Sequence, residues 1–144
     1  MLGLGEAGPA HVGGGAFRGS HREGGGTRAY GKEKECLVAE VSLRDLCAVI
    51  RSKQAGPFRL TFDLIFRDEE TYERVKASGA LTRRMVAALY RVPEGHITDF
   101  VFYDPGRAVK ISMLRPRVAG DPGDGDVYGC QQHAPLLGVR LTLS

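Results

Sequence analysis

The chain has 144 residues, with 20 basic against 17 acidic side chains and a formal net charge of +3. This length is that of one domain, and no apolar run approaches the roughly 20 residues that cross a bilayer, so we expect a soluble protein. A small net charge spread along the chain does not favour nucleic acid as a partner. Three widely spaced cysteines, with no secretory signal pattern after Met1, predict reduced thiols and a cytoplasmic location.

The first 36 residues differ in composition from the rest. They hold 11 of the 20 glycines and few large apolar side chains, without helical or strand periodicity. Such a segment buries too little apolar surface to offset the entropy lost on ordering. We therefore predict a disordered Gly-rich extension over 1–36 and one folded domain over 37–144. A further hypothesis is that translation begins near Leu37 or Val38.

The next segments predict a helix and a strand. Ser42 and Asp45 form a short capping box, and the apolar residues that follow recur at helical spacing, which predicts a helix over 42–53. Residues 58–66 alternate and predict the strongest strand of the chain. Its inward row would be Phe58, Leu60, Phe62, Leu64 and Phe66.

Two further helices are predicted from their ends. Asp68 is a suitable N-cap and Gly79 a suitable C-cap for a helix over 69–78. A third helix begins at Thr82 and ends before Pro93.

The C-terminal half predicts strands and one long loop. Strands over 97–103 and 108–114 are joined by a turn in which Pro105 supplies the fixed φ and Gly106 the positive φ. A last strand is predicted over 136–143. The whole order indicates an α+β domain, with helices on one face of a mostly antiparallel sheet of about four strands.

The 18 residues between these strands, 118–135, form the longest aperiodic stretch and the best candidate for a site. Its acidic first half allows three interpretations: a metal site formed by Asp124 and Asp126, with or without His133, a Gly-rich turn whose Asp side chains cap backbone N–H groups, or a protein interface. We assign no metal. We expect substitutions of these three residues to leave stability nearly unchanged.

The second half of this stretch gathers a phenol, two amides and an imidazole, which are suited to proton transfer and to orienting a carboxylate or carbonyl. A purely structural role for the glutamines and the histidine remains the alternative. The candidate catalytic residues are Asp124, Asp126, Tyr128, Gln131, Gln132 and His133.

Three other residues are candidates for ligand binding. Arg51 and Lys53 fall at the end of the predicted first helix, where cations are favourable for dipole reasons alone or could capture a coenzyme A phosphate or a carboxylate. Asp63 lies mid-strand, either facing solvent beside Arg59 or turned into a site.

Four segments carry a resemblance to a known family: 50–58, 61–63, 100–105 and above all 122–137. Together they resemble a family of short bacterial and archaeal proteins catalogued as a domain of unknown function. This domain is similar to the small, ferredoxin-fold-like partner of the acyclic terpene utilisation proteins, which lies next to or is fused with the large protein. The resemblance implies a partner role in the catabolism of branched or terpenoid acids as coenzyme A thioesters.

Two functions from different classes follow. The chain is either an accessory subunit that completes a half-site on a larger acyclic-terpene-utilisation-like protein, or a small lyase, hydratase or isomerase acting alone. We favour the subunit, because about 108 folded residues offer little room for a deep pocket. The sequence leaves the cofactor and homo-oligomerisation open.

Overall fold

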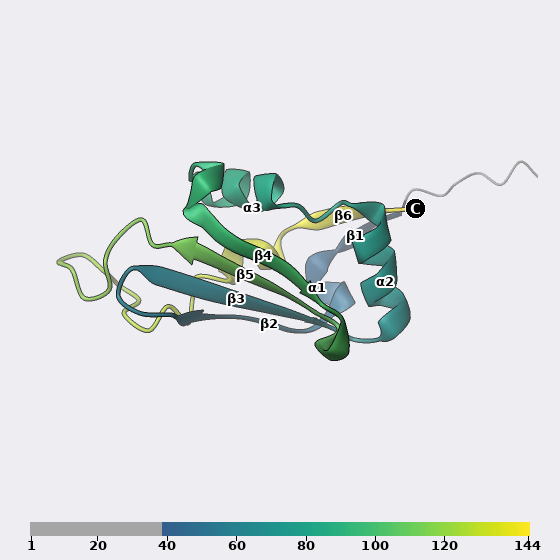
Figure 1. The fold of residues 1–144 in the computed structure, drawn as a ribbon, viewed down its shortest axis with the longest axis horizontal. Coiled ribbons are helices and arrows are strands. Elements are labelled where there is room, and N and C mark those ends of the chain that lie inside the picture. The colour runs from purple at the N-terminus through teal and green to yellow at the C-terminus, as the bar shows by residue number, and fades with distance from the viewer. Residues whose placement is uncertain (1–38) are drawn as a thin grey trace, which may run out of the picture. The chain divides into compact units, whose positions relative to one another are not determined.

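Two antiparallel sheets carry the fold of residues 39–144, the part of the chain that the computed structural model describes (Figure 1). The extension predicted over 1–36 lies outside the described residues. The strands are β1 (Ala39–Ser42), β2 (Cys47–Gln54), β3 (Arg59–Phe66), β4 (Ile97–Tyr103), β5 (Ala108–Leu114) and β6 (Arg140–Leu143). The helices are α1 (Leu43–Leu46), α2 (Glu69–Ser78), α3 (Arg83–Tyr90) and α4 (Ala134–Leu137).

The larger sheet has the strand order β2-β3-β5-β4, and β1 pairs with β6 in a separate two-stranded ribbon. The predicted class, an α+β domain on an antiparallel sheet of four strands, is confirmed. Within that class the main sheet is built from two hairpins, with α2 and α3 both in the connection between them. A ferredoxin-like domain has the order β-α-β-β-α-β. In this chain the order is instead β2, β3, α2, α3, β4, β5.

The predicted helix over 42–53 is wrong beyond its first turn. Only Leu43–Leu46 is helical, and Cys47–Gln54 forms β2, which pairs with β3 along its length. The Ser42 side chain makes no capping hydrogen bond. Val49 and Ile50 favour a strand because of their β-branching, and pairing with the strongly apolar β3 overrides the helical spacing of the apolar residues.

The two long helices agree with their predicted ends. Asp68 accepts a hydrogen bond from the Thr71 N–H (2.7 Å), and Gly79 adopts a left-handed φ of 61° after α2. Thr82 accepts from the Met85 N–H (3.1 Å) at the start of α3. These caps satisfy backbone groups that a helix end leaves without partners.

Two details of the C-terminal half differ from the prediction. In the β4–β5 turn the positive φ (47°) belongs to Arg107 and not to Gly106. The last strand is only Arg140–Leu143, because the chain forms the short helix α4 first. The ribbon strand β1 has no counterpart in the prediction.

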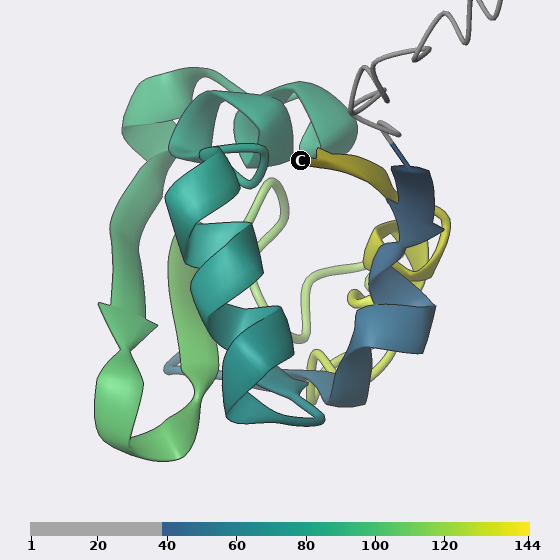
Figure 2. The same ribbon diagram turned by 90° about the vertical axis from the view of Figure 1, so that its right-hand side faces the viewer.

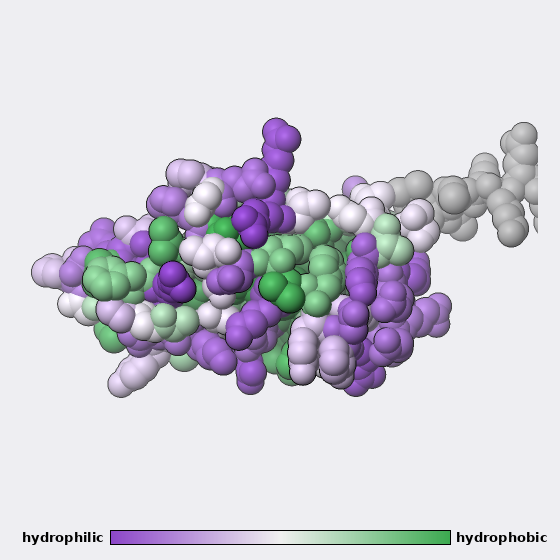
Figure 3. Space-filling view, in the orientation of Figure 1, coloured by the Kyte–Doolittle hydropathy of each residue, from purple (hydrophilic) through white to green (hydrophobic). Residues whose placement is uncertain are grey.

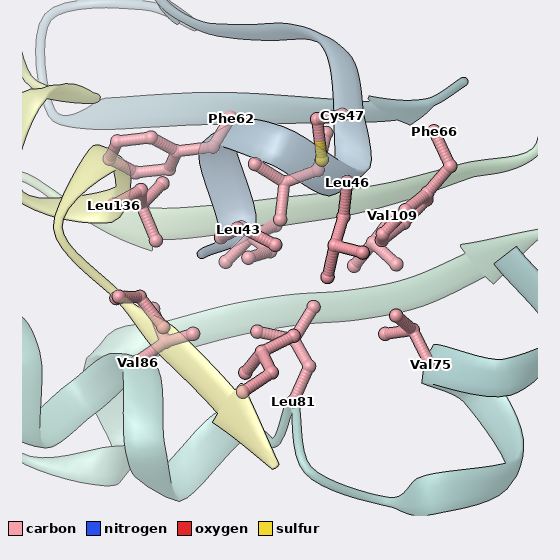
Figure 4. Close-up of a cluster of buried hydrophobic side chains, with 14 of the residues drawn as sticks. Leu43, Leu46, Cys47, Phe62, Phe66, Val75, Leu81, Val86, Val109 and Leu136 are labelled. Carbon is pink, nitrogen blue, oxygen red and sulfur yellow. The ribbon is translucent and has the colours of Figure 1, made fainter. Parts of the chain in front are cut away.

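One hydrophobic core lies between the larger sheet and everything that packs on it. Figure 2 looks onto α2, with β4 and β5 on one side and α1, β1 and β6 on the other. In Figure 4, Phe62 and Phe66 of β3 face Val75 of α2, Val86 of α3 and Leu81 in the connection between these two helices. All of these side chains are at most 2% exposed.

The inward row of β3 is confirmed from Leu60 to Phe66, whereas Phe58 is 61% exposed in the turn before the strand. Within residues 39–144, no helix combines the length and apolar character needed to cross a bilayer.

Candidate functional site

The loop between β5 and α4 is organised around Arg115, which follows the last residue of β5. Its side chain is only 4% exposed. The guanidinium donates to the Val127 carbonyl (3.0 Å), to Asp124 Oδ1 (3.1 Å) and to the Asp126 carbonyl (2.9 Å). One buried cation therefore ties together three points of the loop.

Asp124 is the partner of this cation and also a backbone cap. Its Oδ2 accepts from the Gly120 N–H (2.8 Å), and its Oδ1 accepts from the Asp126 N–H (3.0 Å) as well as from Arg115. The hydrogen bonds from Gly120 and Asp126, with the Arg115 charge, hold the pKa of Asp124 below its usual value.

Asp126 closes the next turn of the loop. Its Oδ1 accepts from the Cys130 N–H (3.0 Å), and its Oδ2 accepts from the Gln131 N–H (2.9 Å) and from Gln132 Nε2 (3.0 Å). Burial raises the pKa of Asp126, but these three hydrogen bonds and the charge of Arg115 lower it more, so the net shift is downward. Both carboxylates stay ionised near neutral pH and act as acceptors that hold the loop, which corresponds to the Gly-rich turn interpretation.

The loop is fastened to the edge strand β2. The Gln54 N–H donates to the Tyr128 carbonyl (2.7 Å), and the buried Ser52 hydroxyl donates to the Gly129 carbonyl. Gly129 has a φ of +67°, and a Cβ there would overlap the Leu60 side chain and lie 3.1 Å from the Gln54 nitrogen. Only glycine fits this close approach without strain.

His133 reaches the same serine. Its backbone N–H donates to Ser52 Oγ (3.1 Å), and its Nδ1 lies 3.4 Å from that oxygen. The Tyr90 hydroxyl donates to the Gln132 carbonyl (2.7 Å), and burial raises the pKa of Tyr90. The imidazole is thus held against β2, while Tyr128 is 76% exposed.

A cavity of about 380 Å³ lies inside the curve of this loop. It is lined by residues of the β5 end, by the glycines and carboxylates of the loop, and by two amides. Gln131 uses its backbone N–H to hold the loop and leaves its side chain at the exposed edge of the cavity. Arg117 donates to the Pro122 carbonyl (2.7 Å) and forms another part of the wall. The arrangement can hold a small polar group, with the Gln131 side-chain amide available to orient it.

The metal interpretation finds no support in the geometry of the described part of the chain. No group of three or more His, Cys, Asp or Glu side chains gathers there in a way that could hold an ion. Asp124 and His133 serve different partners, Arg115 and Ser52.

The predicted ligand-binding residues lie elsewhere. Arg51 and Lys53 are on strand β2 and not at a helix end. Arg51 Nε lies 2.9 Å and Lys53 Nζ 3.9 Å from Asp63 Oδ2 on β3. Side chains alternate along a strand, so these two residues face the opposite side of the sheet from Ser52. The structure therefore separates the Arg51–Lys53–Asp63 group from the loop, and the partner of Asp63 is Arg51 rather than Arg59.

Sequence reasoning missed Arg115, Ser52 and Gly129 as parts of the site. Arg115 had a local signal, because a cation directly after a strand and before an acidic Gly-rich stretch is a natural partner for its carboxylates. Ser52 and Gly129 had none, because their roles depend on β2 being a strand that lies against the loop.

The comparisons with known proteins agree on one point. Residues 43–140 match the family model described as Domain of unknown function (DUF4387). Neither the curated proteins nor the solved structures give a match. The matched range contains both long hairpins, the Arg115-centred loop and α4, and on this basis the chain belongs to the DUF4387 family.

Proposed function

We propose that this domain is an accessory subunit that completes a half-site on a larger acyclic-terpene-utilisation-like protein, in the catabolism of branched or terpenoid acids carried as coenzyme A thioesters. The substrate class comes from the family resemblance. The structural support comes from how the loop uses its polar groups.

The observation that carries the proposal is the use of Asp124 and Asp126. Their four carboxylate oxygens accept hydrogen bonds from the loop itself and from Arg115. A general acid for turnover near neutral pH needs a raised pKa, whereas both of these pKa values are lowered. Asp124 and Asp126 are therefore better suited to fix the surface of the loop than to act as general acids.

The groups left for a ligand are at the exposed edge of the cavity. Gln131 offers an amide, and the cavity is small for an acyl thioester. A second protein that covers this cavity would supply the remaining walls and the reacting groups.

The test is to co-express the chain with the acyclic-terpene-utilisation-like protein encoded nearest to it, and to co-purify the two through a tag on one of them. We expect a stable complex that turns over a branched acyl-coenzyme A, whereas this chain alone does not. Gln131→Ala should lower turnover of the complex while binding is retained, and Glu94→Ala in the turn before β4 is the matched control. Turnover by the chain alone would make it a stand-alone enzyme, and no complex would refute the accessory role.

A further inference from the structure

The four helices of residues 39–144 lie on one side of the four-stranded sheet (Figure 2), and the second face carries exposed side chains except in the row of Lys53 and Asp99, where Thr61 and Ser112 are 4% and 8% exposed. The helices pack on the side of Phe62, so residues one position away in register face outward. We call this surface the open sheet face and define it by Val49, Arg51, Asp63, Lys110, Val101 and Tyr103. Val49 is 39%, Val101 51% and Tyr103 57% exposed.

The strand register arranges this face in rows. One row crosses all four strands through Val49, Ile65, Ala108 and Tyr103. With strands about 4.8 Å apart, it forms an apolar strip of roughly 14 Å. Val101 adds to it, two residues from Tyr103 on β4. Figure 3 shows apolar atoms reaching the surface in the middle of the view, where β4 runs in Figure 1, with hydrophilic side chains around them.

The rows beside the strip are charged. In the next row Arg51, Asp63, Lys110 and Val101 are neighbours, and Lys53 and Asp99 lie at the two ends of the row after it. Cations outnumber carboxylates, and Asp63 is already shared by Arg51 and Lys53. The apolar strip is therefore bordered by excess positive charge.

We propose that the open sheet face is the docking surface for a protein partner that presents an apolar strip bordered by carboxylates. The inference rests on the proposed accessory function and assigns the surface through which that function is exercised. Exposed apolar side chains collected on one face mark interaction sites, and complementary charge fixes partner and orientation.

The charge pattern selects this occupant over others from the same chain. A second copy would bring one positive face against another. Residues 1–38 contain five Lys or Arg against four Glu, so they offer no excess of carboxylates.

Nucleic acid fits less well. Single-stranded bases stack on aromatic side chains, and the strip offers Tyr103 as its only aromatic member beside aliphatic Val49 and Val101. Arg51 is also engaged by Asp63. The aliphatic strip favours a protein surface.

The experiment measures the dissociation constant between this chain and the co-expressed acyclic-terpene-utilisation-like protein by calorimetry. Val101→Glu places a charge in the strip, and Lys110→Glu reverses a charge beside it. Leu137→Glu on α4 and Arg84→Glu on α3 are matched controls at exposed positions that are not on the open sheet face. Circular dichroism and melting of each variant establish that it is folded.

We expect each variant of the open sheet face to weaken binding by at least about tenfold and each control to change it less than about twofold. Affinity of the parent should also fall as salt rises. Binding that both face variants leave unchanged would overturn the docking face while the accessory function stands, and no binding by the parent would refute both. A parent dimer that Val101→Glu dissociates, or tight binding of a polyuridine oligonucleotide that Lys110→Glu abolishes, would assign the face to a different occupant.

Discussion

The guanidinium of Arg115 and the carboxylate of Asp124 lie 3.1 Å apart, with their side chains 4% and 6% exposed. A pair this buried cannot lose one member without leaving the other charge uncompensated. The sequence predicts that Asp124→Ala spares stability, and the geometry reverses that expectation. The Arg115–Asp124 pair in this loop therefore contributes to the stability of the domain, in addition to shaping its surface.

Removing the cation should therefore destabilise the domain. Arg115→Met keeps much of the side-chain volume but leaves Asp124 unpaired, and we expect it to lower the free energy of unfolding clearly. Urea unfolding monitored by circular dichroism measures the loss. Arg117→Met, two residues on and exposed, is the control and should cost well under half as much. Equal stability of Arg115→Met and the parent would show that the pair does not hold the loop.

Acid should weaken the same loop. The folded pKa values of Asp124 and Asp126 are lowered, so their stabilising contribution is complete above the unfolded value of 3.8 and is lost as the pH falls through the folded values. We expect the free energy of unfolding to fall steeply below about pH 4, and Asp124→Asn to flatten that fall. Asp121→Asn, at an exposed position of the same loop, should keep the slope of the parent. A slope that is the same in all three proteins would contradict the assignment.

Gly129 tests the contact between the loop and β2. Gly129→Ala forces a side chain at a φ of +67° into Leu60 and the backbone of β2, so we expect a loss of about 2 kcal/mol or more. Gly125→Ala is the control, because a Cβ there meets nothing within 4 Å. Thermal melts of the two variants should differ by several degrees, and a Gly129→Ala melt equal to that of Gly125→Ala would argue against the close approach.

The facing of β3 is tested by two phenylalanines. Phe62 is fully buried, with its ring centroid 5.2 Å from that of Tyr90, and Phe62→Ala should cost about 3 to 5 kcal/mol. Phe58 is 61% exposed, so Phe58→Ala should stay within about 0.5 kcal/mol of the parent. Chemical denaturation of both variants separates the two positions. A small effect at Phe62 would mean that the strand faces the other way.

The thiols should differ in reactivity. Cys47 is buried, and that burial raises its pKa to about 12 although Arg67 opposes the shift, whereas Cys130 is exposed. Iodoacetamide at neutral pH should therefore label Cys130 and spare Cys47 in the folded protein. Peptide mapping by mass spectrometry reads each site separately, and denatured protein is the control in which both react. Rapid labelling of Cys47 under native conditions would refute its place in the core.

The elements that the sequence predicts correctly are those with local signals. Strand β3 has strict alternation, and α2 and α3 have caps that satisfy their own ends. The prediction for strand β2 is wrong because the apolar residues of this segment also fit a helical spacing. Only the pairing with β3 decides between a helix and a strand. Short elements such as β1 and α4 are stabilised by residues distant in sequence, so their own residues carry almost no sequence pattern that predicts them.

Composition predicts a candidate site in the loop, but it does not predict how the residues of that loop are used. The stretch 118–135 is long, polar and aperiodic, and the structure places a cavity within it. The use of Asp124 depends on Arg115, and that of His133 depends on Ser52. The open sheet face has no counterpart in the sequence prediction, because the helix predicted over 42–53 takes the place of strand β2.

The β1–β6 ribbon joins Ala39 to Leu143, two residues at opposite ends of the described chain. Closing so long a loop costs entropy that the hairpins do not have to overcome, so the ribbon should form after them. Leu141 and Leu143 complete the core only when that happens. An incompletely folded chain would thus keep both hairpins while its core stays exposed on the side of β6. The β1–β6 ribbon would be the last element to form during folding and the first to open in local unfolding.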